Sequence, residues 1–211
     1  MKKTIKGLLI FMLIASMLFV LTGCGDKETA KKEDKEETVE QKQETNIEQE
    51  EKTEFSMGEW NNNVYTNDFL GLKFNLPDGW TYSSDEELEE TNKQMAEQNG
   101  VGYVTAMDPN TGNNINIFSE KPAIDITTEV YINQLKTKLS AVETVTYEIG
   151  ETSKEEFAGR ECDTLEMTTT MYGVKVTQKY YIYKIDKYII GIIATSLDGE
   201  TGINEIIECF E

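Results

Sequence analysis

The chain has 211 residues and a formal net charge of −19, from 39 acidic and 20 basic residues, with no histidine. An acidic surface repels phosphate backbones, so we expect no nucleic acid among its partners. Without histidine, Ser-His-Asp, Cys-His and histidine-based zinc sites are excluded, while catalysis by carboxylates, lysine or tyrosine remains possible. No motif indicates such catalysis, so we predict no catalytic residues, no cofactor and no metal ligands.

The N-terminal segment has the pattern of an export signal. Lys2, Lys3 and Lys6 precede an uncharged, mostly apolar stretch from Leu8 to Leu21. This stretch is shorter than the roughly 20 residues that a membrane-spanning helix needs, and it fits the apolar region of a signal peptide. Residues 1–23 are therefore predicted to be a signal peptide.

The end of this stretch, Leu21-Thr22-Gly23-Cys24, resembles the lipobox of bacterial lipoproteins. The resemblance implies cleavage before Cys24 and diacylglycerol on its thiol, with fatty-acyl chains such as palmitate as the anchor. Two or more acyl chains hold a protein stably at a membrane, whereas one chain does not. We therefore expect a protein on the outer face of the cell membrane, with Cys24 as its lipidation site. An uncleaved signal anchor is the alternative.

The segment that follows Cys24 is predicted to be a tether. Residues 25–57 contain almost no apolar side chains before Phe55, and their twelve acidic residues against six lysines give a net charge of −6. Low hydrophobicity and dense charge cannot offset the entropy lost on ordering, so we predict disorder over residues 24–57. A coil of this length reaches about 30 Å, which makes it a spacer between membrane and domain.

Residues 58–211 have the composition of a globular domain, and they are long enough for one hydrophobic core. Within them, Tyr188–Ile193 is apolar on both faces, which predicts a central strand. Val174, Val176 and Gln178 alternate with polar residues, as in a half-buried strand. Hairpin, turn and period-2 signals predict strands at 64–66, 72–76, 80–82, 101–106, 115–119, 144–152, 160–170, 174–185 and 188–196.

Three helices are predicted among these strands. The first follows the capping-box spacing of Ser84 and Glu87, runs to about Gln98, and has a thin apolar stripe of Leu88 and Met95. Consecutive strands joined by tight turns indicate antiparallel pairing, so the predicted fold class is α+β, a mainly antiparallel sheet covered by about three helices. The second helix begins near Thr128, and its apolar face is formed by Tyr131, Ile132, Leu135, Leu139 and Val142. The third helix follows Asp198-Gly199, and its apolar face is formed by Ile203, Ile206, Ile207 and Phe210.

The segment from Val64 to Trp80 looks like the opening of PsbP-like domains and of uncharacterised Gram-positive lipoproteins that share a Y-x-N…G-[LI]-x-F-x-x-P-x-x-W signature. The later order of strands and helix is similar, so the resemblance covers roughly residues 60–211. It implies a PsbP-like α/β/α sandwich. Relatives with this sandwich serve as an extrinsic photosystem subunit and as a Ran-binding import factor, both non-catalytic protein binders. No functional residues carry over, because the match is to the structural opening.

One candidate metal loop is Asp108-x-Asn110-x-Gly112-x-Asn114, which places oxygen ligands at alternate positions as calcium loops do. Its glycine is one place late for an EF-hand, and no glutamate closes the loop. A hairpin turn rich in asparagine and glycine is therefore the favoured interpretation.

The two cysteines of the domain, Cys162 and Cys209, lie outside the cytoplasm if the signal is used, so they could form a disulfide. Because a core of this size does not require such a cross-link, two buried free thiols are favoured.

Aromatic residues supply the remaining candidates. Trp80 is predicted to be a core residue, and Trp60 is the better candidate for an exposed ring. Tyr181 and Tyr183 should share one sheet face, with Tyr180 on the other. These tyrosines could stack on a sugar or peptide, although cross-strand packing needs no ligand.

These observations predict a lipid-anchored, non-catalytic binding module with a monomeric domain. Its partner would be a protein or another component of the cell envelope. Divalent-cation binding, or a carboxylate- or lysine-based enzyme acting on envelope components, are the alternatives.

Overall fold

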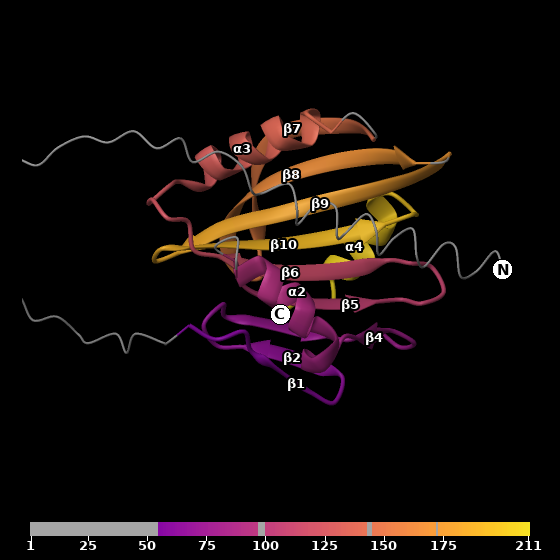
Figure 1. The fold of residues 1–211 in the computed structure, drawn as a ribbon. Coiled ribbons are helices and arrows are strands. Elements are labelled where there is room, and N and C mark those ends of the chain that lie inside the picture. The colour runs from indigo at the N-terminus through magenta and orange to yellow at the C-terminus, as the bar shows by residue number, and fades with distance from the viewer. Residues whose placement is uncertain (1–54, 97–99, 143–144, 172) are drawn as a thin grey trace, which may run out of the picture.

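The structure is a computed structural model that describes residues 55–96, 100–142, 145–171 and 173–211 (Figure 1). The predicted signal peptide, Cys24 and the tether up to residue 54 lie outside these ranges. Across the described ranges, no helix is both long enough and apolar enough to cross a membrane.

A small antiparallel sheet opens the domain. Its strand order is β1-β2-β3. The strands are β1 (Glu59–Asn61), β2 (Val64–Asn67) and β3 (Leu72–Asn75).

The main sheet has seven strands in the order β4-β5-β6-β10-β9-β8-β7, and all neighbours are antiparallel. Its central strand, β10, contains the Tyr188–Ile193 run, which confirms that prediction. The strands are β4 (Thr81–Tyr82), β5 (Gly100–Met107), β6 (Asn114–Glu120), β7 (Thr146–Phe157), β8 (Arg160–Met171), β9 (Val174–Ile185) and β10 (Tyr188–Ser196).

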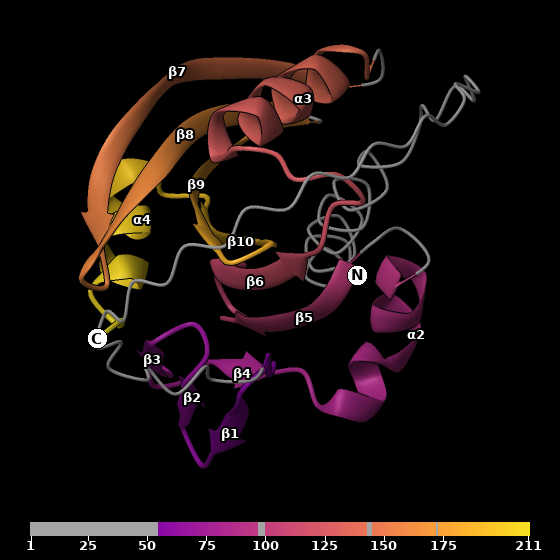
Figure 2. The same cartoon turned by 90° about the vertical axis from the view of Figure 1, so that its left-hand side faces the viewer.

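Three helices of the described chain cover the main sheet: α2 (Asp85–Ala96), α3 (Thr128–Ser140) and α4 (Glu200–Ile207). Figure 2 shows α2 and α3 on one face and α4 with the small sheet on the other. Helix α2 packs on β5, α3 on β7 to β9, and α4 on β9 and β10. The predicted α+β class, mainly antiparallel with about three helices, is confirmed.

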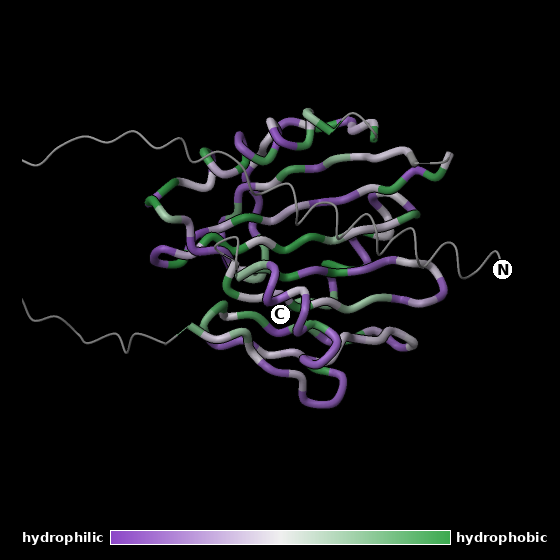
Figure 3. The backbone as a smooth tube through the Cα atoms, in the orientation of Figure 1, coloured by the Kyte–Doolittle hydropathy of each residue, from purple (hydrophilic) through white to green (hydrophobic). Residues whose placement is uncertain are grey.

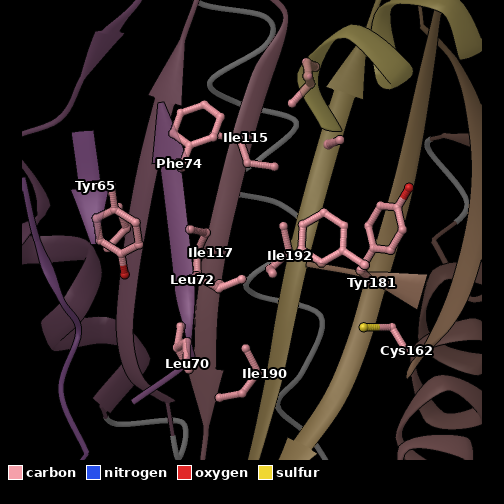
Figure 4. Close-up of a cluster of buried hydrophobic side chains, with 14 of the residues drawn as sticks. Tyr65, Leu70, Leu72, Phe74, Ile115, Ile117, Cys162, Tyr181, Ile190 and Ile192 are labelled. Carbon is pink, nitrogen blue, oxygen red and sulfur yellow. The ribbon is translucent and has the colours of Figure 1, made fainter. Parts of the chain in front are cut away.

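The first core fills the space between the small sheet, α4 and the main sheet (Figure 4). Tyr65 and Phe74 of the small sheet face Ile117 of β6 and Ile192 of β10, and all four are almost fully buried. Because side chains alternate between the faces of a strand, odd residues of β6 and even residues of β10 point into this core.

The second core lies between the main sheet and helices α2 and α3. The predicted helix faces are confirmed here, because Leu88 and Met95 of α2 are buried and so are Tyr131, Ile132, Leu135 and Leu139 of α3. Gly191 of β10 is needed in this core, since a Cβ at that position would overlap the Phe118 ring. Figure 3 shows that hydrophobic residues follow the central strands, while hydrophilic residues gather in the loops.

Both long helices begin with side-chain caps. The Ser84 backbone N–H donates to Glu87 Oε2 at 2.8 Å, and the Glu87 N–H donates to Ser84 Oγ at 3.4 Å, which is the predicted capping box. The hydrogen bonds from Ser84 lower the pKa of Glu87. Thr127 caps α3 by accepting from the Val130 N–H at 3.2 Å.

The small sheet is a first difference from the predicted single sheet. Strands β2 and β3 pair as expected, but they add no strand to the main sheet. Strand β1 was not predicted, because its three residues are too short to show a period. Strand β7 continues to Phe157, beyond the predicted end at Thr152, since a register shift between Ile149 and Thr152 interrupts its alternation.

Two of the predicted helices are shorter at their C-terminal ends than expected. Helix α3 ends at Ser140, so Val142 follows it, and α4 ends at Ile207, so Phe210 lies in the segment behind it and bridges to Phe74. The predicted half-buried alternation of β9 is also wrong. Val176, Thr177 and Gln178 are all buried, because this part of β9 is covered on both faces.

Candidate functional site

The chain enters the domain through residues 55–58, which we call the entry strap. The Phe55 ring stacks on Tyr188, with centroids 4.7 Å apart, and meets Phe69 edge-on at 5.2 Å. Met57 fills a notch that exists because residue 102 is glycine. Residues 55–57, which the sequence placed in the tether, therefore pack against the first core. Cys24 lies outside the described residues.

Hydrogen bonds hold the entry strap to β2. The Tyr65 hydroxyl donates to the Met57 carbonyl at 2.6 Å, and Asn67 Nδ2 donates to the Ser56 carbonyl at 3.1 Å. Burial raises the pKa of Tyr65 to about 12, against the opposing effect of the Asn67 side chain, so the phenol stays protonated and keeps donating. The strap therefore fixes the place where the preceding chain meets the domain.

The candidate metal loop is a hairpin turn between β5 and β6. Asp108 Oδ1 accepts from the Asn110 N–H and Oδ2 from the Thr111 hydroxyl, both at 2.7 Å, while the Asn114 amide is buried and donates to the Gly112 carbonyl at 3.0 Å. Desolvation of Asp108 is outweighed by the bonds from Asn110 and Thr111, so its pKa is lowered. The carboxylate oxygens of Asp108 therefore accept hydrogen bonds within the turn, in agreement with the favoured interpretation of a hairpin turn. In the described part of the chain, no group of three or more Cys, Asp or Glu side chains is placed to hold a metal ion.

Cys162 and Cys209 are free thiols, as the favoured alternative predicted, but only Cys162 is fully buried. Cys162 is buried, and desolvation raises the pKa of its thiol to about 11. Burial also raises the pKa of half-buried Cys209, whose Sγ donates to the Glu205 carbonyl at 3.3 Å. Both thiols are protonated near neutrality and are poor nucleophiles.

The tyrosine run is packed inside the domain. Tyr181 and Tyr183 point into the first core and Tyr180 into the second, as predicted, and all three are buried. Tyr181 stacks on Phe157 with centroids 4.5 Å apart. Cross-strand packing therefore accounts for these rings.

The two tryptophans differ less than expected. Both are half-buried: Trp80 lies 6.4 Å from the Phe74 ring, and Trp60 stacks on Tyr82 at 4.2 Å with planes 8° apart. Trp60, the better candidate for an exposed ring, is partly covered by this stack. Tyr82, with 38% of its surface exposed, is the outer ring of the pair.

A buried carboxyl group that sequence reasoning missed lies at the end of β6. Glu120 accepts a hydrogen bond from the Tyr131 hydroxyl of α3 at 3.0 Å. Desolvation raises the pKa of Glu120 to about 7, against the opposing effects of Tyr131 and Lys138. Burial lowers the pKa of Lys138 in turn. The alternation of β6 could have indicated this residue, since Phe118 and Glu120 share a face.

Further polar groups lie on the same face of β5, β6, β9 and β10, the face on which α2 and α3 pack; we call this region the interhelical face. The Tyr103 hydroxyl donates to Asn116 Oδ1, and Gln178 Nε2 donates to Thr195 Oγ1 at 3.2 Å. Gln178 Oε1 is buried without a hydrogen-bond partner among the described residues. Buried polar groups beside a carboxyl group with a perturbed pKa are typical of functional sites, which makes this face the candidate functional region.

Comparisons with known proteins add a likeness of fold. No protein-family model and no curated protein matches the chain. Cyanobacterial PsbP (CyanoP) from Synechocystis is 14% identical with a TM-score of 0.45, over 70% of this chain and 90% of that one. LpqN of Mycobacterium tuberculosis, described as involved in cell envelope biogenesis, is 18% identical with a TM-score of 0.42, over 66% and 81%.

A Bacteroides thetaiotaomicron protein is 15% identical with a TM-score of 0.40, over 66% of this chain and 44% of that one. The chain thus spans less than half the length of that protein. None of these likenesses identifies a functional residue of this chain.

Proposed function

We propose that this protein is a lipid-anchored lipoprotein on the outer face of the membrane, whose domain binds a protein or another envelope component without catalysis. The observation that carries the proposal is the Leu21–Cys24 motif, which ends an apolar stretch and precedes a highly charged segment. That segment joins a folded domain through the entry strap. Anchor, spacer and compact domain together form the plan of a surface-displayed binding module.

The state of the reactive side chains supports a non-catalytic role. Nucleophilic catalysis needs a thiol or amine with a lowered pKa or an adjacent base. In this domain, burial raises the pKa of both thiols. The hydrogen bond to Glu161 raises the pKa of Lys154, and Lys179, though desolvated, has its pKa raised by Glu155. These four groups are held in their protonated forms, whereas burial lowers the pKa of Lys138.

Metabolic labelling tests the anchor. With a labelled fatty acid supplied to the producing bacterium, we expect label on the native chain and none on a Cys24→Ala variant. Mass spectrometry should find the native chain cleaved before Cys24. An unlabelled native chain that retains residues 1–23 would contradict the proposal.

Crosslinking in the native envelope tests the binding role, with the domain displayed on its own segment 24–57. We expect a specific crosslinked partner that is lost when purified domain is added in excess as a competitor. A matched display of segment 24–57 without the domain controls for capture by the charged segment. Equal capture by both would contradict binding by the domain.

A second candidate, acid–base chemistry, is favoured by Glu120 alone. A carboxyl group with a pKa near 7 suits a general acid or base. If the purified domain hydrolysed wall or peptide substrates, and if Glu120→Gln abolished this turnover in a folded protein, the non-catalytic proposal would be wrong.

A further inference from the structure

We infer that the end of the domain bearing the entry strap faces the bilayer and touches it through the β6–α3 loop. The inference rests on the proposed lipid anchor. We call residues 121–125 and 184–188 the bilayer patch. Figure 1 shows the start of the described chain, the β6–α3 loop and the β9–β10 turn on the same side of the domain, away from the β5–β6 and β8–β9 turns.

The bilayer patch directly adjoins the entry strap. Phe55 stacks on Tyr188. The same ring makes a cation–π contact with Lys121, whose Nζ lies 5.9 Å from the ring centroid. Lys184 Nζ donates to the Asp125 carboxylate and, at 3.1 Å, to the Ile126 carbonyl. The β6–α3 loop is thus held at both ends. Lys121 contacts Tyr188 of β10, the ring on which the entry strap packs, and Asp125 binds Lys184 of β9.

This fixed loop holds the most exposed large apolar side chain of the described domain. Ile124 has 72% of its surface exposed, and Val130, on the first turn of α3, has 42%. A single exposed apolar residue is ordinary on a soluble surface. Ile124 differs because the loop that carries it is held beside the point where the chain arrives from the membrane. An apolar tip there can enter the headgroup boundary of a bilayer.

The bilayer patch is less acidic than the domain as a whole. Residues 58–211 contain 27 acidic and 11 basic side chains, a net charge of −16, whereas the patch has three lysines and two aspartates, a net charge of +1. Both ends of the main sheet carry acidic side chains: Asp108 and Asp198 lie near the turns of the opposite end, and Glu156 and Glu161 flank the β7–β8 turn toward the end of the patch. An anionic bilayer repels such carboxylates within a Debye length of about 8 Å, whereas the patch itself has no net negative charge.

Because the proposed tether keeps the domain near the membrane, a weak contact between the bilayer patch and the lipid is sufficient for binding. Thirty residues separate Cys24 from Phe55, so the root-mean-square distance between the anchor point and the start of the domain is roughly 30 Å. A flexible linkage of this kind gives an effective concentration on the order of millimolar. A patch with only millimolar affinity for lipid is then occupied for much of the time, and no large apolar area is required.

Quenching from the bilayer tests the orientation. The full lipidated chain, with Cys209→Ser to remove the half-buried thiol, is placed in vesicles of equal parts phosphatidylglycerol and phosphatidylcholine. A fluorophore is attached through Ile124→Cys or, as the matched control, through Val174→Cys. Val174 is 42% exposed and follows the β8–β9 turn at the opposite end. With brominated acyl chains, we expect at least about twice the quenching at position 124.

A second variant tests the contact itself. With the fluorophore on the exposed first turn of α3 through Glu129→Cys, replacing Ile124 by Asp should lower the quenching from its value with Ile124 in place to the level of position 174, while circular dichroism shows an unchanged fold. Equal quenching at 124 and 174, or no effect of Ile124→Asp, overturns the inference while the anchor stands. A chain that does not float with the vesicles lacks the anchor, and both proposals then fall.

Discussion

Glu120 couples the protonation of one side chain to the stability of the domain. Burial raises its pKa from 4.5 to about 7 in the folded state, so the folded protein binds this proton more tightly than the unfolded chain. The free energy of unfolding therefore falls as pH rises from about 4.5 to about 7, and it does not fall further above that range on account of this group. The stabilising form is the protonated one.

Replacing Glu120 by glutamine should remove this dependence. The amide is neutral and its oxygen can still accept from Tyr131, so Glu120→Gln should match the native protein at about pH 4 and exceed it by up to about 3 kcal/mol at about pH 8. Urea denaturation at both pH values measures the difference. Glu89→Gln, at an exposed position of α2, is the control. An identical effect of Glu120→Gln at both pH values would contradict the assignment.

The thiols provide a second prediction at this scale. In the folded protein, iodoacetamide should modify half-buried Cys209 slowly and leave Cys162 unmodified, because Cys162 is buried and its thiol has a pKa of about 11. In urea both should react at the same rate, as peptide mass spectrometry would show. Rapid modification of Cys162 under native conditions would mean that the first core opens readily.

Strand β10 shows how an element depends on one residue without a side chain. Gly191→Ala would place a methyl group into the Phe118 ring at the centre of the main sheet. We expect a loss of about 1 to 3 kcal/mol in the free energy of unfolding, as for other overpacked cores. Phe118→Leu should recover part of this loss, so a double-mutant cycle is the measurement. Strictly additive effects of the two substitutions would contradict the contact.

Elements with local signals could be predicted from the sequence. The capping box of Ser84 and Glu87 and the period of α3 depend on residues within one or two turns, and the structure confirms them. The extension of β7 to Phe157 could not be predicted, because the register shift after Ile149 is defined only by pairing with β8. Strand β1 likewise exists through its partner β2.

At the scale of the whole molecule, the segment behind α4 joins the two sheets. The Glu211 N–H donates to the Lys73 carbonyl at 2.9 Å, and the Lys73 N–H donates back at 3.2 Å. Phe210 lies between Phe74 of the small sheet and Phe157 of the main sheet, with centroids 4.7 and 4.9 Å away. This segment therefore extends the small sheet and closes the first core.

Phe210→Ala should consequently destabilise the domain by about 2 to 3 kcal/mol, somewhat less than the loss of a fully buried phenylalanine. Chemical denaturation measures this, with Val174→Ala at an exposed position as the control, for which we expect a change within about 0.5 kcal/mol. Similar values for the two variants would show that the sheets hold together without Phe210.

The candidate site was only partly accessible to sequence reasoning. The faces of Tyr180, Tyr181 and Tyr183 follow from the period of one strand, and the structure confirms them. The Glu120–Tyr131 bond could not be derived, because it forms only when α3 folds back on β6. The partial cover of Trp60 could not be derived for a similar reason, since Tyr82 comes from the other sheet. Lipidation of Cys24 is a local motif and stays a prediction.

The entry strap determines how a mechanical load from the membrane would reach the domain. Force along the chain arrives at the Phe55–Tyr188 stack and the two hydrogen bonds to residues 56 and 57 before it reaches the β1–β2 ladder. The strap can therefore peel while both sheets stay intact, which adds about 13 Å of reach for four residues. Single-molecule pulling should record this short extension ahead of the main rupture. Under load, the link between the domain and its anchor would then lengthen before the domain unfolds.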